Sequence, residues 1–146
     1  MRKHLPDFVK NMRVVSIEEL RGHEDIDPAH LEALTTQIEA DGILKKPIVA
    51  DDCTRVILDG HHRVAALKKL GCRKVYVCFV DYASSRIVVE PGKSGKAMNK
   101  EVVLRAGLSG KLLPPKSSRH MVRLSKEMKH ISYIQRDVNV PLEKLK

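Results

Sequence analysis

The chain has 146 residues, enough for one domain with its own core and too few for two ordinary domains. Charged residues make up 31% of it and apolar residues 42%, which indicates a globular protein rather than a disordered one. The net charge of +9 favours polyanions or small phosphorylated ligands, whereas an aromatic content of 3% with no Trp argues against a base-stacking surface.

Three patterns in the sequence have the spacing and end signals of helices. The first begins at Asp27-Pro28, an N-cap oxygen followed by proline at the first helical position, and ends at Asp41-Gly42. The second covers residues 61–70 and carries its apolar side chains on one face. The third covers residues 100–108, with Asn99 as its N-cap.

Short runs of apolar and β-branched residues predict strands, and Ser16 is placed to cap a brief turn after the first of them. These runs are residues 13–17, 47–50, 55–58, 74–80 and 87–89. From Lys111 onward only short apolar stretches remain, and we expect an irregular tail. The sum is an α/β fold, of the α+β kind, with flanking helices around a small mixed sheet.

Neither zinc nor a membrane is expected. Cys53, Cys72 and Cys78 form no C-x-x-C pair, and three unpaired thiols fit a reducing compartment. No apolar run approaches the roughly 20 residues of a membrane-spanning helix. The N-terminal residues also lack the apolar segment of a signal peptide. We therefore expect a cytoplasmic protein.

The segment Asp59-Gly60-His61-His62-Arg63 carries the strongest functional signal. It follows an apolar run and opens the second predicted helix. A strand that turns directly into a helix leaves free backbone N–H groups. Together with the helix dipole and the Arg63 guanidinium, these donors favour a bound phosphate. An exposed arginine in a first helical turn is nevertheless common without any ligand.

The other side chains of this segment allow more than one interpretation. Asp59 either caps the helix or holds Mg²⁺ beside the phosphates, and both roles are compatible if water bridges the ion. His61 and His62 point about 100° apart on a helix, so they cannot easily chelate one metal ion. We expect one of them to face the phosphates and the other to pack or face water.

Four segments resemble the ParB/sulfiredoxin superfamily, and most closely its archaeal free L-serine kinases (SerK and SbnI-like enzymes). The superfamily marker is the helix start Gly60-x-x-Arg63-x-x-Ala66. The segments shared with the kinases are Gly22-His23-Glu24, residues 41–49, residues 58–63 and residues 113–120. They run in the same order and span most of residues 13–145. The resemblance implies a single domain over 1–146, with its core in 13–90 and a helix and phosphate clamp in 97–146.

What the resemblance implies is phosphoryl transfer from ADP or ATP, with Mg²⁺, to the hydroxyl of free L-serine, giving O-phospho-L-serine. Such a reaction needs positioning, neutralised phosphates and a base near the attacking hydroxyl. Glu24 matches the family's catalytic glutamate and would accept the serine proton. On the residues alone, Glu24 is more simply an acidic lead-in to the helix that begins at Asp27-Pro28.

The remaining candidates follow the same pattern of a functional and an ordinary interpretation. Ser117, Ser118, Arg119 and His120 would form a second phosphate clamp, or else a basic surface loop. Lys46-Pro47 would bind the serine carboxylate, or else Lys46 belongs to a solvated pair of lysines at a helix end.

Gly92-Lys93-Ser94-Gly95-Lys96 lacks the spacing of a phosphate loop, so we interpret it as a hairpin turn.

Two observations bear on the acceptor and on the competing function. The interval 83–113 is shorter than in the archaeal kinases, which carry extra structure there, and this affects the acceptor pocket rather than the phosphate site. The alternative function is a ParB-like, nucleotide- and DNA-associated regulator without kinase activity, which the charge of +9 favours. No helix-turn-helix pattern follows the core, and the C-terminal part contains Pro114, Pro115 and Pro141.

Overall fold

The computed structural model describes residues 5–93 and 95–146. Three helices occur in this part of the chain, α1 (Pro28–Asp41), α2 (His61–Lys69) and α3 (Lys100–Ser109). The strands are β1 (Val9–Ser16), β2 (Ile43–Leu44), β3 (Ile48–Asp51), β4 (Ile57–Asp59), β5 (Lys74–Val80), β6 (Ile87–Pro91), β7 (Ser118–Leu124), β8 (Glu127–His130) and β9 (Val140–Pro141). Short 3₁₀ turns follow β1, β8 and β9, at Ile17–Glu19, Ile131–Ile134 and Leu142–Leu145.

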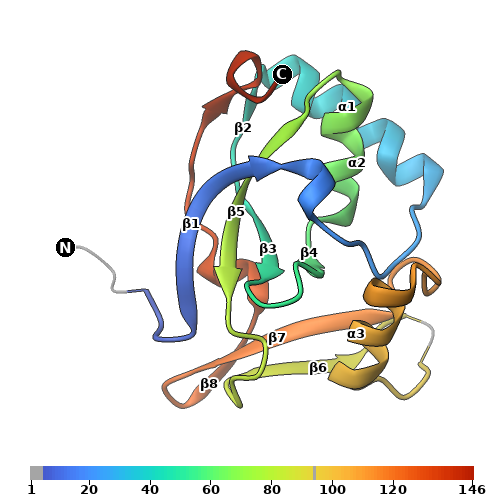
Figure 1. Cartoon of the computed structure of the whole chain (residues 1–146), viewed down its shortest axis with the longest axis vertical. Coiled ribbons are helices and arrows are strands. Elements are labelled where there is room, and N and C mark those ends of the chain that lie inside the picture. The colour runs from blue at the N-terminus through green and yellow to red at the C-terminus, as the bar shows by residue number, and fades with distance from the viewer. Residues whose placement is uncertain (1–4, 94) are drawn as a thin grey trace.

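A four-stranded mixed sheet in the order β1-β5-β3-β4 forms the centre of the molecule (Figure 1). β3 and β5 are parallel, while β1 and β4 run antiparallel to their neighbours. The β3–β4 hairpin is closed by Asp51, whose Oδ2 accepts hydrogen bonds from the backbone N–H and the hydroxyl of Thr54. This hairpin delivers the chain to Asp59 and the start of α2.

Both faces of the central sheet are buried. On β5, Val75, Val77 and Phe79 face a core shared with α1 and α2, whereas Cys78 and Val80 face a second core. The alternation follows from the period of two residues along a strand. The second core also contains residues of α3 and β7, so the three-stranded sheet β6-β7-β8 packs below the central one (Figure 1). β7 is thereby held against the end of the β3–β4 hairpin.

The predicted helices are confirmed because their end signals are local. Asp27 Oδ1 accepts the backbone N–H of Ala29, and Gly42 ends α1 in the left-handed conformation with φ of 68°. Asn99 caps α3 through the N–H of Val102. Ser16 likewise caps the turn after β1. These short-range hydrogen bonds require no tertiary contact, which is why the sequence alone reveals them.

The predicted small mixed sheet is present, and β2–β9 and β6-β7-β8 form two further sheets among the described residues. Two other predictions are wrong. The region after Lys111 is not irregular: it contains β7, β8 and β9. Buried polar residues such as His120 break the apolar alternation that marks a strand. Gly92 does not open a hairpin, since β6 pairs with β7 only after the chain has passed through α3; Ser94 of that predicted turn lies outside the described residues.

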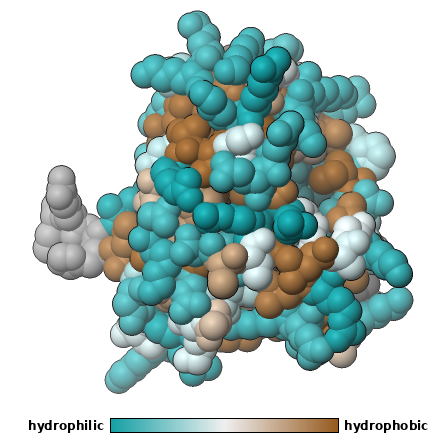
Figure 2. All heavy atoms as spheres, in the orientation of Figure 1, coloured by the Kyte–Doolittle hydropathy of each residue, from teal (hydrophilic) through white to brown (hydrophobic). Residues whose placement is uncertain are grey.

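The surface is largely hydrophilic with separate apolar patches on the face seen in Figure 2. Within the part of the chain that is described, no helix has the length and apolar character to cross a membrane. The three cysteines form no disulfide; Cys53 is exposed, and Cys72 and Cys78 are buried.

Replacing Gly60 by alanine should destabilise the fold by about 3 kcal/mol. An added Cβ would lie 2.5 Å from Ile48 Cγ2, and the φ of 109° strains any L side chain. Gly71 is the matched control, because its φ is 84° but nothing lies within 4 Å of the added Cβ, so its replacement should cost only about 1 kcal/mol. Equilibrium denaturant unfolding measures both losses, and equal losses would contradict the packing argument.

Candidate active site

A cavity of about 350 Å³ opens where α2 begins, beside β7 and the loop that precedes α1. Most of the residues that line it carry polar side chains, and it brings together three of the segments predicted from the sequence. The residues that line it are Glu24, His30, Leu34, Leu58, Asp59, Gly60, His61, His62, Arg63, Lys116, Ser118, Arg119, His120 and His130. His30 and His130 were not predicted, and a lone histidine on a helix or at a strand end carries no sequence signal.

Glu24 is placed in this cavity by backbone pairing over a long sequence distance. A parallel bridge joins it to Leu113. The N–H of Leu113 donates to His23 O at 2.8 Å, and the N–H of Asp25 donates to Leu113 O at 2.7 Å. The Gly-His-Glu segment is therefore extended and clamped against the Pro-Pro-Lys segment. Glu24 is therefore held by tertiary contacts in addition to its place ahead of α1.

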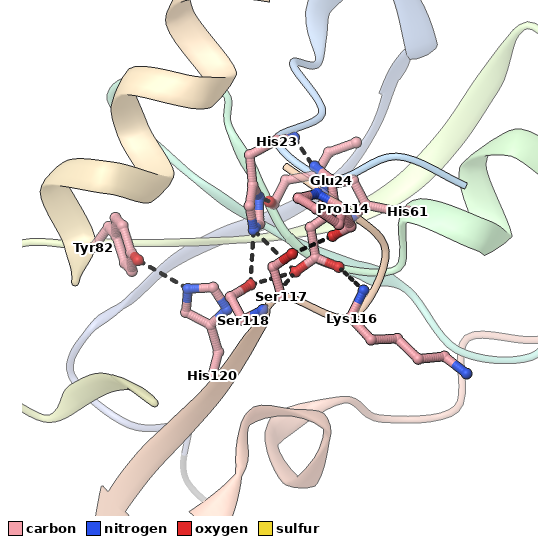
Figure 3. A network of polar contacts seen from close by, with 10 residues as sticks. His23, Glu24, His61, Tyr82, Pro114, Lys116, Ser117, Ser118 and His120 are labelled. Atoms are coloured by element: carbon pink, nitrogen blue, oxygen red, sulfur yellow. Dashed lines mark hydrogen bonds and ion pairs between the residues drawn. The ribbon is translucent and has the colours of Figure 1, made fainter. Parts of the chain in front are cut away.

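The Glu24 carboxylate accepts hydrogen bonds from the turn that follows the two prolines (Figure 3). Oε1 accepts the backbone N–H of Lys116 at 2.9 Å, and Oε2 accepts the backbone N–H of Ser118 at 3.1 Å together with its hydroxyl. Burial alone would raise the pKa of Glu24, but hydrogen bonds from His23 and Ser118 and nearby histidine charge lower it to about 2. The carboxylate is therefore ionised and fixed in orientation.

Ser118 bridges Glu24 to a buried histidine. His23 Nδ1 lies 2.7 Å from the carbonyl oxygen of Ile57, which can only accept, so Nδ1 carries a proton. His23 Nε2 lies 2.9 Å from Ser118 Oγ. The Ser118 hydroxyl donates to Glu24 Oε2, and His23 Nε2 itself lies 3.4 Å from the same oxygen. The buried imidazole therefore lies against the carboxylate and also reaches it through one hydroxyl.

His61 and His62 both line the cavity as neutral imidazoles. His61 Nε2 accepts the backbone N–H of His23 at 3.0 Å, and His62 Nε2 accepts that of Asp27 at 3.0 Å. Because a backbone N–H can only donate, Nε2 is unprotonated in both rings and Nδ1 carries the proton. Burial lowers the pKa of His61 to about 3 and also lowers that of His62, which stacks on His30. Both rings are thus hydrogen-bond donors without charge.

Arg63 and Asp59 are engaged with each other, which corrects one prediction. Asp59 does not cap α2: the N-cap is Gly60, with no side-chain hydrogen bond. Instead Asp59 Oδ2 accepts from Arg63 at 3.0 Å and from Gln135 at 2.7 Å, while Arg63 also donates to Pro47 O at 2.8 Å. The guanidinium of Arg63 therefore holds α2 to the loop before β3, although it still lines the cavity. Gln135 was missed because it comes from a distant turn.

Arg119 and Lys116 are the cations of the cavity that remain available. Neither side chain has an ion pair or hydrogen bond among residues 5–93 and 95–146. Arg119 is exposed on β7, and Lys116 stands in the left-handed conformation with φ of 59°. An anion entering the cavity can bind both without displacing an existing partner.

Three predicted residues lie away from the cavity lining. Lys46 Nζ is paired with Asp137 at 2.8 Å, and Pro47 offers only its carbonyl to Arg63. Ser117 is buried and donates its hydroxyl to Pro114 O, so it shapes the turn. The structure thus does not bring the predicted carboxylate-binding pair to Glu24.

The side chains of the cavity could hold a magnesium ion only together with the phosphates of a bound nucleotide. No group of three His, Cys, Asp or Glu side chains in the described part of the chain could hold a metal. Mg²⁺ is commonly held by one carboxylate plus substrate phosphates. Asp59 fits that role, since it lines the cavity and only its Oδ2 has hydrogen-bond partners.

Several curated relatives match about half of the chain, including two L-serine kinases. An ATP-dependent L-serine kinase of Staphylothermus marinus is 32% identical over 78 residues, which is 51% of this chain and 31% of that protein. An ADP-dependent L-serine kinase, SerK, of Thermococcus kodakarensis is 32% identical over 79 residues, which is 51% of this chain and 33% of that protein. The match thus spans about a third of these relatives' length. No family model matches the chain.

The likeness in structure extends over the whole chain. A free serine kinase in complex with AMP aligns with a TM-score of 0.77 at 17% identity, covering 100% of this chain and 98% of that one. At this identity the comparison shows a shared fold. The α/β fold and the resemblance to the free serine kinases are confirmed.

Replacing Glu24 by glutamine should remove part of the acid sensitivity of folding. The pKa of Glu24 is about 2 in the fold against an ordinary 4.5, so its contribution is complete above pH 4.5 and is lost as the pH falls toward 2. That contribution is of the order of 3 kcal/mol. Urea unfolding between pH 2 and 6 should show a shallower loss in Glu24→Gln, with the exposed Glu101→Gln as control. An unchanged slope in Glu24→Gln would contradict the assigned hydrogen bonds.

Proposed function

We propose that the protein is a kinase that transfers a phosphoryl group from ADP or ATP to the hydroxyl of free L-serine, with Mg²⁺. The observation that carries the proposal is the ionised Glu24 carboxylate in the wall of a cavity that also presents cations and N–H donors. The two relatives named as L-serine kinases support the choice of substrate. The neighbour that binds AMP supports the choice of nucleotide.

The phosphates bind at the β7 side of the cavity under this proposal. Arg119 and Lys116 neutralise charge, and the Nδ1–H groups of His61 and His62 donate hydrogen bonds. The free backbone N–H groups at the start of α2 add to the same field. Asp59 would hold Mg²⁺ together with the phosphates, and the ion would neutralise charge on the transferred group.

Glu24 is the base for the serine hydroxyl. A carboxylate with a pKa of about 2 is a weak base, so it does not ionise serine beforehand. In a loose phosphoryl-transfer transition state the hydroxyl becomes acidic only as its oxygen bonds to phosphorus, and a correctly placed carboxylate then suffices. The fixed orientation of Glu24 is therefore more important than its basicity.

Incubation with L-serine, Mg²⁺ and either ADP or ATP should yield O-phospho-L-serine, detected by mass spectrometry. Glu24→Ala should retain nucleotide binding and lose about a hundredfold or more in kcat, because the base is removed. Chelation of Mg²⁺ should abolish formation of O-phospho-L-serine with ADP and with ATP.

Two results would contradict the proposal: no phosphoserine with either donor while nucleotide binds, or an unchanged rate in Glu24→Ala. The first, joined to DNA binding that weakens steeply with salt, would favour the ParB-like alternative.

Replacing Arg119 by alanine should weaken nucleotide binding by roughly tenfold to a hundredfold, since one charge-assisted contact to phosphate is lost. Arg123 is the matched control: it is exposed on the same strand but does not line the cavity. Calorimetric titration with ADP measures both. Equal effects in Arg119→Ala and Arg123→Ala would mean that only the overall charge attracts the nucleotide.

A further inference from the structure

Tyr82 lies behind the cavity wall and belongs to none of the four sequence segments. It follows β5, is 2% exposed and does not line the cavity. Its hydroxyl lies 2.8 Å from Nε2 of His120 on β7, as Figure 3 shows. His120 itself lines the cavity. Tyr82 therefore touches the candidate site only through this histidine.

His120 has one ring nitrogen free to meet a ligand. Nε2 faces Tyr82, whereas Nδ1 has no hydrogen-bond partner in the described part of the chain. No buried side-chain nitrogen or oxygen there lacks a partner, so Nδ1 is not fully buried, and the cavity is the space that His120 lines. Burial and the neighbouring His23 lower the pKa of His120 to about 3, so the ring is neutral and carries a single N–H.

The phenol decides which nitrogen carries that proton. Burial raises the pKa of Tyr82, so its hydroxyl stays protonated. That proton has no acceptor other than His120 Nε2 among the described residues. If Nε2 carried the ring proton instead, the phenolic proton would be buried without a partner and a lone pair of Nδ1 would face the bound anion. Both consequences cost free energy.

Tyr82 is itself held in place by two further contacts. Its backbone N–H donates to Asp51 Oδ1 at 3.1 Å. Lys100 Nζ lies 5.1 Å from the centre of its ring and donates to Ser84 O at 2.8 Å. The side chain is thereby fixed between the β3–β4 hairpin and α3.

We propose that Tyr82 is a positioning residue that locks His120 in the Nδ1–H tautomer, so that a neutral imidazole donates a hydrogen bond to a nucleotide phosphate. This inference rests on the proposed function. Together with His61 and His62, His120 then completes a set of uncharged N–H donors. Such donors stabilise the charge of the phosphate by hydrogen bonding, and a neutral imidazole is too weak an acid to transfer its proton to the phosphate.

Tyr82→Phe tests the inference because it removes only the hydroxyl. Tyr76→Phe is the matched control: Tyr76 lies on β5, is partly buried and makes no hydrogen bond in the described structure. Long-range ¹H–¹⁵N spectra report the tautomer of His120, assigned with His120→Gln. Wild type and Tyr76→Phe should show Nδ1–H, and Tyr82→Phe should gain the Nε2–H form. ADP affinity should fall about tenfold in Tyr82→Phe and stay at the wild-type value in Tyr76→Phe.

Two outcomes overturn the inference while wild type still binds ADP. One is a His120 tautomer that is the same in wild type and Tyr82→Phe. The other is an ADP affinity that falls equally in Tyr82→Phe and Tyr76→Phe. Failure of the wild-type protein to bind ADP would instead overturn the proposed function, so the two failures are distinguishable.

Discussion

The hydrogen bonds to the Glu24 carboxylate join the two halves of the chain. Both oxygens are bound by the turn at Lys116 and Ser118, more than 90 residues further along the sequence, at separations of 92 and 94. Without this contact the loop before α1 and the start of β7 would keep the bridge at Leu113 and the contact between His23 Nε2 and Ser118 Oγ. The same contact leaves Glu24 ionised and oriented at the cavity wall. Structure and chemistry thus depend on one side chain.

In the cavity, positive charge and uncharged hydrogen-bond donors come from different residues. Permanent positive charge that is free for a ligand comes from Arg119 and Lys116, while Arg63 is largely occupied by Asp59. His61, His62 and His120 add donors rather than charge, because each ring accepts a hydrogen bond at Nε2 within the fold. In a site of this kind, the arginine and lysine determine how strongly phosphate binds. The imidazoles determine how the phosphate is oriented.

Sequence reasoning found what local patterns determine. Asp27 and Asn99 marked their helices because each cap is completed within a few residues. It failed for β7, whose buried face includes His120, and it missed Gln135, which becomes a partner of Arg63 only once the chain is folded. His30 and His130 had no signal at all. Glu24 was predicted as a catalytic residue from the family resemblance. From the residues alone it would have been interpreted as an acidic lead-in to the helix.

A crystal structure of the ADP complex tests the central claim most directly. The account predicts the terminal phosphate in the cavity at the start of α2, in contact with Arg119 and with the Nδ1–H groups of His61 and His120, and beside a Glu24 that keeps its hydrogen bond from the N–H of Lys116. Phosphates bound elsewhere, or a Glu24 turned away from the nucleotide into the protein, would contradict it.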